Sequence, residues 1–490
     1  MRKIKLITFV TALLLLLIGS IIITNYITHN QKETQKTFYV GVTYCGNSVQ
    51  EAKELVDKVK NYTNLFTLQS GTMQNATEVE EIGDYVVASK MSFAVYNSDK
   101  IYYGTVGGIG VNQWALSAKE RWKEQFIGIY YRDEPGGDLL DGKLVNLEKT
   151  GYQINEYRGE TEIVPSLTKY GESITVYERD QDGRITSTTA YWPDGRVNIR
   201  TYNRTNNELI QYFPNGTIII NKTTLGNFRG TSEVYTEENI TKHSSTIQSY
   251  EQVLKQNPIQ NNDDAAKAFV NMNQKFLDDI NKKQLNKESI SVFTADYGLY
   301  WWEYKGGYDF VLAELGWNNS ITQEISLVRG AANLQNKEWG TILTWKYTHP
   351  PYLTDGEEMF EQMKISYEAG ANYVIIFNYS EDPINHNTLQ EEHFQALERF
   401  WKDIVQNPKV IHGGIKAEAV LVLPQNYGWG MRNPQDTLWG LWYADNTTQK
   451  IWNQLQDKTE QYDLKLDIVF EDPNHLAIWK YNKVYYWNQK

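Results

Sequence analysis

Residues 126–137 read FIGIYYRDEPGG, and this stretch decides the fold class. Apolar and aromatic residues form a strand, which ends abruptly at two acids, a proline and two glycines. Because alternate side chains of a strand share a face, four residues are expected to point toward the axis of a closed sheet: Gly128, Tyr130, Arg132 and Glu134. The stretch therefore predicts a parallel sheet with acids at its carboxyl-terminal edge.

Short apolar runs of this kind alternate with helical patterns along the chain. With residues 126–132, the strand-like runs are residues 38–44, 65–70, 91–96, 289–296, 308–315, 340–346 and 373–379. Amphipathic segments lie between them, at 49–61, 265–282, 357–369 and 391–405, and Gly370 is expected to end the third of these helices. Eight strands close a (β/α)8 or TIM barrel, so the predicted fold class is α/β, with this barrel over residues 37–410.

Two regions fall outside the barrel pattern. Within residues 145–260, between the fourth and fifth strands, β-forming residues alternate and are punctuated by Asp182-Gly183, Asp194-Gly195 and Asn215-Gly216, which favour hairpin turns. This predicts an antiparallel β insertion that either gates a cleft at the barrel mouth or decorates it. Residues 411–490 predict a small C-terminal α/β domain, with strands at 417–423 and 466–470, a helix at 446–462 and a final strand pair within 476–487.

The N-terminus carries a membrane signal. Arg2, Lys3 and Lys5 precede an uncharged apolar run, residues 6–24, which predicts that residues 1–36 form a cytoplasmic tip, a transmembrane signal anchor and a tether. The bulk of the chain is then extracellular at the cell membrane; a cleaved signal peptide is the alternative. Nine sequons agree with an exported glycoprotein: Asn61, Asn75, Asn203, Asn215, Asn221, Asn239, Asn318, Asn378 and Asn446. An anchored chain of this kind suits an archaeal envelope.

Composition limits the partners. A net charge of -12 without a basic cluster argues against nucleic acid and favours a neutral or cationic ligand. Cys45 is the single cysteine, so no intrachain disulfide forms, and a small buried residue is its expected role. No nucleophile elbow, P-loop or His-Glu-X-X-His motif occurs, and no cofactor or metal is expected.

Acids at strand ends are the candidate catalytic residues, because parallel barrels carry their chemistry there. Asp133 and Glu134 end the fourth strand, and Glu314 lies in the apolar sixth strand, where an ionised carboxylate is unfavourable unless it is paired or functional. Glycosidic-bond hydrolysis needs two such carboxyl groups. The structural alternatives are that Asp133 caps the turn or pairs with Arg132 or Arg329, and that Glu314 pairs with Lys346.

Aromatic and polar residues near the same strand ends are candidate ligand contacts. Sugar rings stack on aromatic faces, and polar groups bind hydroxyls. The predicted substrate-binding residues are Tyr44, Asp296, Trp301, Trp345, Lys346, Tyr379 and Trp429. Trp429 belongs to an aromatic, glycine-rich loop, residues 426–432, which is a candidate to close over the mouth.

The eight-strand order, the sequence Asp133-Glu134-Pro135 and the acid on the sixth strand resemble the barrel glycoside hydrolases, especially the retaining enzymes with acids on strands four and six. The resemblance covers roughly residues 38–408. In those relatives the fourth-strand acid is often an aspartate nucleophile, and either Asp133 or Glu134 matches it. The chain departs from the larger group of barrel glycosidases because no strong acid ends its seventh strand.

Three functions are compatible with these features. The first is an extracellular glycoside hydrolase that cleaves O-glycosyl bonds of a glycan with the acids above. The second is a non-catalytic glycan-binding or cell-envelope protein on the same scaffold, and the third is a structural surface protein whose β insertion mediates adhesion. Neither the glycan nor the oligomeric state follows from the sequence.

Overall fold

The computed structural model describes residues 37–69, 76–97, 105–106, 109–140, 161–168, 171–179, 185–192, 195–202, 206–212, 218–224, 231–235, 259–317, 319–379, 388–442, 444–474 and 477–488. The predicted membrane anchor lies outside these residues. None of the helices among the described residues has the length and apolar character needed to cross a bilayer.

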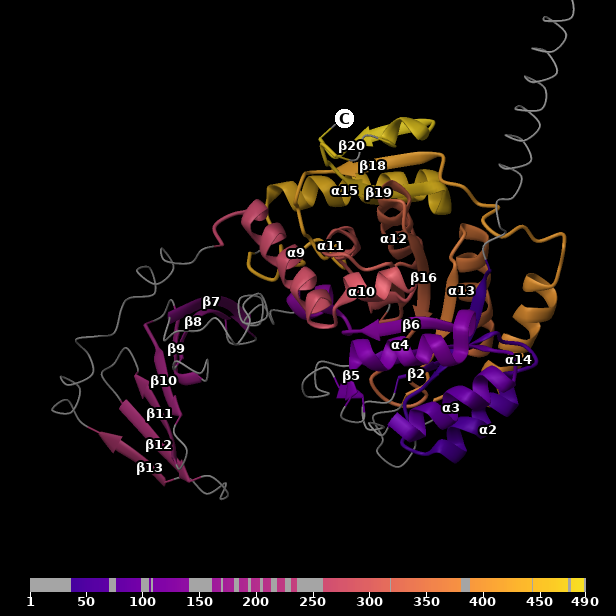
Figure 1. Ribbon diagram of the computed structural model, residues 1–490. Coiled ribbons are helices and arrows are strands. Elements are labelled where there is room, and N and C mark those ends of the chain that lie inside the picture. The colour runs from indigo at the N-terminus through magenta and orange to yellow at the C-terminus, as the bar shows by residue number, and fades with distance from the viewer. Residues whose placement is uncertain are drawn as a thin grey trace, which may run out of the picture. The chain divides into compact units, whose positions relative to one another are not determined.

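Eight parallel strands close into a barrel, which confirms the predicted TIM-barrel fold (Figure 1). Around the barrel they run β1 (Tyr39–Tyr44), β2 (Leu65–Leu68), β3 (Ser92–Asn97), β6 (Phe126–Tyr131), β14 (Ser291–Asp296), β15 (Phe310–Leu315), β16 (Glu338–Leu343) and β17 (Tyr373–Ile376). Each corresponds to one predicted run. The largest shifts are at the ends of the seventh and eighth runs, predicted at residues 346 and 379, because β16 ends at Leu343 and β17 at Ile376. Composition marks the presence of a strand better than its ends.

Aromatic rings fill the barrel interior. The ring of Phe293 stacks on Tyr130 at 5.2 Å and on Phe310 at 4.3 Å, and Phe310 stacks on Tyr373 at 4.0 Å between centroids. Backbones must approach closely beside these large rings, and a Cβ on Gly128 would lie 2.1 Å from the Ser291 carbonyl oxygen. The strand alternation within β6 therefore holds up to Tyr130.

Helices follow the barrel strands: α2 (Val49–Val59), α3 (Ala76–Ala88), α4 (Val111–Trp122), α5 (Pro135–Asp138), α9 (Asn262–Asp279), α10 (Lys282–Lys287), α11 (Tyr300–Gly306), α12 (Ile321–Gln335), α13 (Gly356–Ala369) and α14 (Glu391–Phe400), which a π-helical turn continues (Trp401–Val405). Asp355 caps α13 at its N-terminus, and Gly370 ends that helix at a φ of 94°, as predicted. Only glycine adopts that conformation without a penalty from Cβ.

A separate seven-stranded antiparallel sheet forms between β6 and α9. Its strands are β7 (Thr161–Thr168), β8 (Gly171–Arg179), β9 (Ile185–Tyr191), β10 (Val197–Tyr202), β11 (Asn206–Tyr212), β12 (Ile218–Thr224) and β13 (Thr231–Tyr235). Each strand pairs with its neighbours in sequence, so the predicted hairpin pattern is present (Figure 1). Gly195 has a φ of 85° in one turn, whereas Asp182-Gly183 and Asn215-Gly216 lie outside the described residues.

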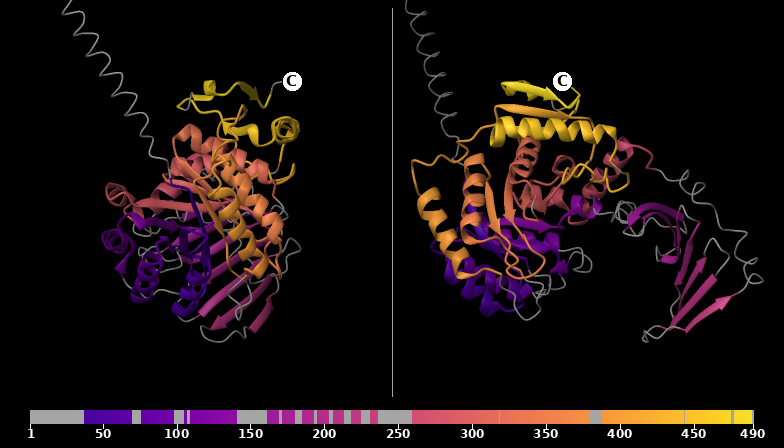
Figure 2. Two further views of the ribbon diagram at one scale, coloured as in Figure 1. Left: turned by 90° about the vertical axis from the view of Figure 1, so that its right-hand side faces the viewer. Right: turned by 180° about the vertical axis from the view of Figure 1, so that it is seen from behind.

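The C-terminal region forms a three-stranded parallel sheet with the long helix α15 (Asn446–Tyr462) beside it (Figure 2). Its strands are ordered β19 (Leu466–Phe470), β18 (Ala419–Leu423) and β20 (Lys483–Tyr486). The predicted final strand pair is wrong: its first half is a 3-10 turn, Ala477–Lys480, and β20 pairs with β18 in parallel. Composition does not distinguish a short strand from a single helical turn of the same residues.

A buried ion pair joins α12 to β19. Arg329 Nε donates to Asp467 at 2.7 Å, and Arg329 Nη2 donates to the carbonyls of Leu464 and Leu466. Tyr481 also donates to Asp467. Arg329 therefore does not pair with Asp133, which was one structural alternative for that acid.

Candidate active site

The segment Arg132–Asp138, called the acid loop below, follows β6 directly. Arg132 and Glu134 have φ values of 60° and 48°, in the left-handed region that non-glycine residues rarely adopt. The predicted alternation consequently fails at Arg132, whose guanidinium lies over the Phe276 ring of α9 at 3.5 Å instead of facing the barrel axis. Such backbone conformations persist only where neighbouring structure holds them.

The end of β14 holds the acid loop. Thr294 Oγ1 donates to the Arg132 carbonyl, and the Glu134 N–H donates to the Ala295 carbonyl, each at 2.9 Å. Asp296 then accepts N–H groups from Gly136 and Gly137. The last three residues of β14 thus fix the loop at its start, middle and end.

The two glycines of the loop are required by space. A Cβ at Gly136 would lie 2.8 Å from the Gly298 carbonyl oxygen, and one at Gly137 would lie 2.3 Å from Tyr297 Cζ. Real Cβ atoms do not approach other atoms so closely. The sequence DEPGG therefore encodes a loop packed directly on the next strand.

Three predicted catalytic acids gather at this edge of the barrel. Glu314 is on β15 and is 5% exposed, and its carboxyl group is in hydrogen-bonding contact with that of Glu134. Asp133 accepts a hydrogen bond from Tyr130 Oη inside the barrel. The structure therefore brings together the acids of the fourth and sixth barrel strands.

Burial and mutual repulsion keep protons on these acids. Burial raises the pKa of Glu314 well above its usual range, and the charges of Glu134 and Asp133 raise it further. Burial, and then the charge of Glu134, raise the pKa of Asp133 to about 7, although Tyr130 opposes this shift. At neutral pH the group consequently contains both proton donors and proton acceptors.

Polar atoms on other strands accompany the acids. Thr67 Oγ1 and Gln69 Oε1, at the end of β2, are buried without a hydrogen-bond partner, as is Glu314 Oε2. Burial raises the pKa of the Cys45 thiol to about 12, and the charge of Asp133 adds to that shift, so the thiol is un-ionised. Acceptors without partners are suited to a ligand that brings hydroxyl or ammonium donors.

An aromatic cluster lies at the ends of β15, β16 and β17. The Trp345 ring stacks on Tyr379 at 5.8 Å between centroids, and its Nε1 donates to the Tyr379 carbonyl at 2.9 Å. Trp317, three residues after Glu314, packs edge-on against Trp345 and is 38% exposed. Two predicted ligand contacts therefore form one partly open aromatic surface, to which Trp317 is an addition.

Other predicted ligand contacts are engaged elsewhere in the fold. Lys346 pairs with Glu358 of α13 at 2.5 Å, so it is not the partner of Glu314. Tyr44 is fully buried, and its hydroxyl donates to the Ser48 carbonyl at the start of α2. Asp296 is also fully buried and accepts three backbone N–H groups.

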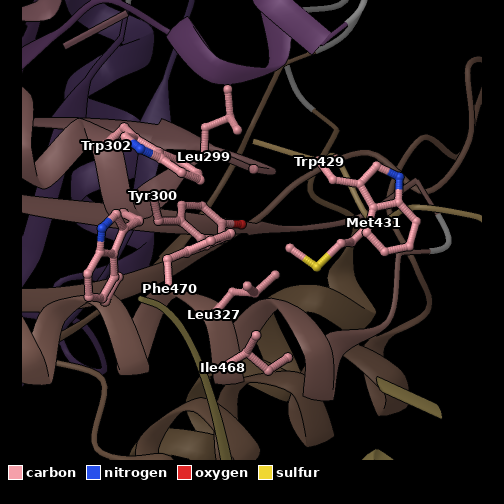
Figure 3. A pocket seen from close by; sticks show the side chains of 12 residues that line it. Leu299, Tyr300, Trp302, Leu327, Trp429, Met431, Ile468 and Phe470 are labelled. Atoms are coloured by element: carbon pink, nitrogen blue, oxygen red, sulfur yellow. The ribbon is translucent and has the colours of Figure 1, made fainter. Parts of the chain in front are cut away.

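Trp301 and Trp429 line a small cavity among α11, α12 and the C-terminal region (Figure 3). Its volume is about 10 Å³, and Figure 3 shows apolar side chains such as Leu327, Ile468 and Phe470 around it. A cavity of that size holds at most one water molecule. Both tryptophans are nearly completely buried, so neither ring has a face open to a sugar.

The structure adds three residues that were not among the predicted site residues: Tyr130, Glu303 and Glu324. The Tyr130 position was recognisable from its inward parity three residues before Asp133. Glu303 and Glu324 lie in helices, and no local pattern distinguishes a buried helical acid from a surface one. Among the described residues no group of three histidine, cysteine or acidic side chains has the geometry to hold a metal ion.

Comparisons with known proteins show only remote likeness. No protein-family model and no curated protein matches the sequence. Among solved structures, a GH5_18 variant from Streptomyces cattleya in complex with Manb1-4GlcNAc is 8% identical, covers 92% of this chain and 99% of its own, and gives a TM-score of 0.43. GH5_18 from the same organism with GlcNAc gives 0.41 at 9% identity over the same shares. Pyruvate kinase from Pyrobaculum aerophilum gives 0.27 at 8% identity, over 79% of this chain and 81% of its own.

Proposed function

We propose that this protein is a glycoside hydrolase whose catalytic groups are Glu134, Asp133 and Glu314. The observation that carries the proposal is the contact between acids from the fourth and sixth barrel strands, in a buried setting that keeps one of them protonated. Two carboxyl groups, one protonated and one ionised, are what hydrolysis of a glycosidic bond requires.

Glu314 is the best candidate for the general acid. Its proton moves to the leaving glycosidic oxygen as the bond to the anomeric carbon breaks, and the resulting carboxylate lies among buried groups. An ionised carboxylate of the acid loop, Asp133 or Glu134, then either attacks the anomeric carbon or takes a proton from the attacking water. The nucleophile role and the base role each account for every bond and proton, and the structure supports the two roles to the same degree.

In retaining enzymes the two carboxyl groups stand roughly 5 to 5.5 Å apart with the scissile bond between them, whereas the Glu134 and Glu314 carboxyl groups interact directly. A substrate that inserts between them has to separate the pair. Glu134 lies on a loop and Glu314 in a strand, so we expect the Glu134 side chain to make the adjustment.

Binding would use the surface formed by Trp317, Trp345 and Tyr379, because aromatic faces stack on the apolar faces of sugar rings. The acids repel polyanionic glycans, so neutral or cationic glycans are the expected substrates. We also propose that the chain acts outside the cell, held by its N-terminal apolar segment. This is supported by the basic flank and the sequons, although Asn378 is fully buried and would not be glycosylated in the folded protein.

The test is hydrolysis of a panel of neutral, cationic and anionic oligosaccharides by the full-length protein. We expect Glu314→Gln and Glu134→Gln each to lower kcat/KM by about 10²–10⁴-fold, as loss of a general acid or base does. Glu324→Gln is the matched control, since Glu324 is also buried but its carboxyl group is held by the Tyr300 hydroxyl at 2.6 Å.

The second candidate is a glycan-binding or envelope protein without catalysis. The close contact of Glu134 with Glu314 favours it, because a pair that never separates leaves no room for a scissile bond. Glycan binding that survives both glutamine substitutions, together with no turnover on any member of the panel, would support this alternative and exclude the hydrolase.

A further inference from the structure

Glu303 is a buried carboxyl group that the proposed reaction does not use. It lies on α11, directly after β14, and is completely shielded from solvent. Neither of its oxygens has a hydrogen-bond donor of adequate geometry, although buried polar groups in proteins nearly always have one. An ionised carboxylate in this position would be both desolvated and unpaired.

Asp296 lies against Glu303 and has the opposite arrangement. Its Oδ1 accepts the N–H groups of Gly137 at 2.9 Å and Tyr297 at 2.7 Å, and its Oδ2 accepts the N–H of Gly136. These three backbone N–H donors stabilise the ionised form of Asp296. The two neighbouring carboxyl groups thus have unequal surroundings: Asp296 accepts three backbone N–H groups, whereas neither oxygen of Glu303 has a donor in hydrogen-bonding geometry and only the Gly136 N–H is near enough to act on it.

We propose that Glu303 is an un-ionised carboxylic acid that donates its proton to Asp296, and that this pair holds the acid loop in the conformation that presents Asp133 and Glu134. The shared proton gives Glu303 the hydrogen bond that it otherwise lacks. It also gives Asp296 a fourth donor. Asp296 acts through the backbone of Gly136 and Gly137, so it is a positioning residue.

The surroundings favour a single negative charge on the pair. Burial, then the charges of Asp296 and Glu314, raise the pKa of Glu303 well above its usual range. Burial also raises the pKa of Asp296 to about 6, because desolvation outweighs its backbone hydrogen bonds. Among the described residues, further acids and phenols interact electrostatically with the pair: Glu324, Tyr300, Tyr304 and Tyr308.

Infrared difference spectroscopy on the full-length protein tests the protonation state. The wild type minus Glu303→Gln spectrum at pH 8 should contain the carbonyl stretch of an un-ionised carboxylic acid, which shifts in D2O. A difference spectrum that contains only carboxylate bands would overturn the proposal. This measurement needs no substrate, so its outcome is independent of whether the protein hydrolyses glycans.

Hydrogen exchange at the amides of Gly136 and Gly137 tests the positioning role. Glu303→Gln keeps a donor toward Asp296 and should leave both amides protected. Glu303→Leu removes that donor. Asp296→Asn replaces one accepting oxygen of Asp296 with an NH2 group, which cannot accept a hydrogen bond. Each substitution should speed exchange by on the order of tenfold or more. Glu324→Gln, the matched buried acid, removes a neighbouring charge but no donor to Asp296, so both amides should stay protected.

Measuring kcat and KM separately distinguishes a positioning role for Glu303 from a purely structural one. If the proposed hydrolase function holds, Glu303→Leu should lower kcat with little change in KM, and Glu303→Gln should restore kcat. Equal protection of the loop amides in Glu303→Leu and wild type would refute the inference even if the acids are catalytic. Faster exchange in Glu303→Leu, in a protein that hydrolyses no glycan, would support the positioning role of the Asp296–Glu303 pair and exclude only the proposed function.

Discussion

Replacing Asp133 by asparagine should stabilise this protein at alkaline pH. Burial and the charge of Glu134 raise the pKa of Asp133 from 3.8 to about 7. The unfolded chain therefore loses this proton near pH 4, whereas the folded chain keeps it until about pH 7. An acid with a raised pKa makes folding less favourable as the pH rises between these two values, and the full penalty remains above pH 7.

The magnitude follows from the size of the shift. A difference of about 3 pKa units at about 1.36 kcal/mol each gives a ceiling of about 4 kcal/mol. Asparagine carries no charge to desolvate, and its side-chain oxygen still accepts from Tyr130 Oη. The variant should consequently unfold at higher urea than the wild type at pH 8 and at nearly the same urea at pH 4.

Urea unfolding of the full-length protein at a series of pH values, followed by tryptophan fluorescence, measures the effect. Asp57→Asn is the control, because Asp57 is exposed and its pKa is lowered by Lys60. It should show no stabilisation that grows with pH. An Asp133→Asn midpoint that is equal to or below the wild-type midpoint at pH 8 would refute the argument that this acid is held in an unfavourable buried position.

Three further substitutions have expected outcomes. Arg329→Leu should lower the free energy of unfolding by about 3–5 kcal/mol because it leaves Asp467 charged and buried. Adding Asp467→Leu should restore most of that stability, and a double variant that loses as much stability as the two single variants together would contradict this. Gly137→Ala should lower kcat about tenfold or more, since its Cβ collides with Tyr297 and moves the acid loop, and unchanged kinetics in a folded variant would argue against that packing. Trp345→Ala should raise KM by roughly threefold to tenfold with kcat nearly unchanged, as loss of one aromatic contact does; a pure kcat effect would place this ring elsewhere in the mechanism.

Local sequence determined the barrel. Strand-forming runs, amphipathic spacing and a glycine stop depend on the backbone preferences of a few adjacent residues, so the eight strands and the end of α13 at Gly370 were predictable. The same holds for α15, whose bounds match the prediction, and for the hairpin sheet. Glu314 was recognisable for the same reason, since a single acid among apolar strand residues is unfavourable unless it is paired or functional.

Tertiary structure decided which of these residues meet. The left-handed backbone at Arg132 and Glu134 is held by β14, more than 150 residues later in the chain, so no periodicity within β6 predicts where those side chains point. Distant packing likewise buries Trp301 and Trp429. The sequence by itself determined that acids stand at the ends of parallel strands, because alternation and chain breaks are local. Only the folded chain decided that Asp296 binds backbone instead of ligand, because a carboxylate binds whichever donors the fold places within its reach.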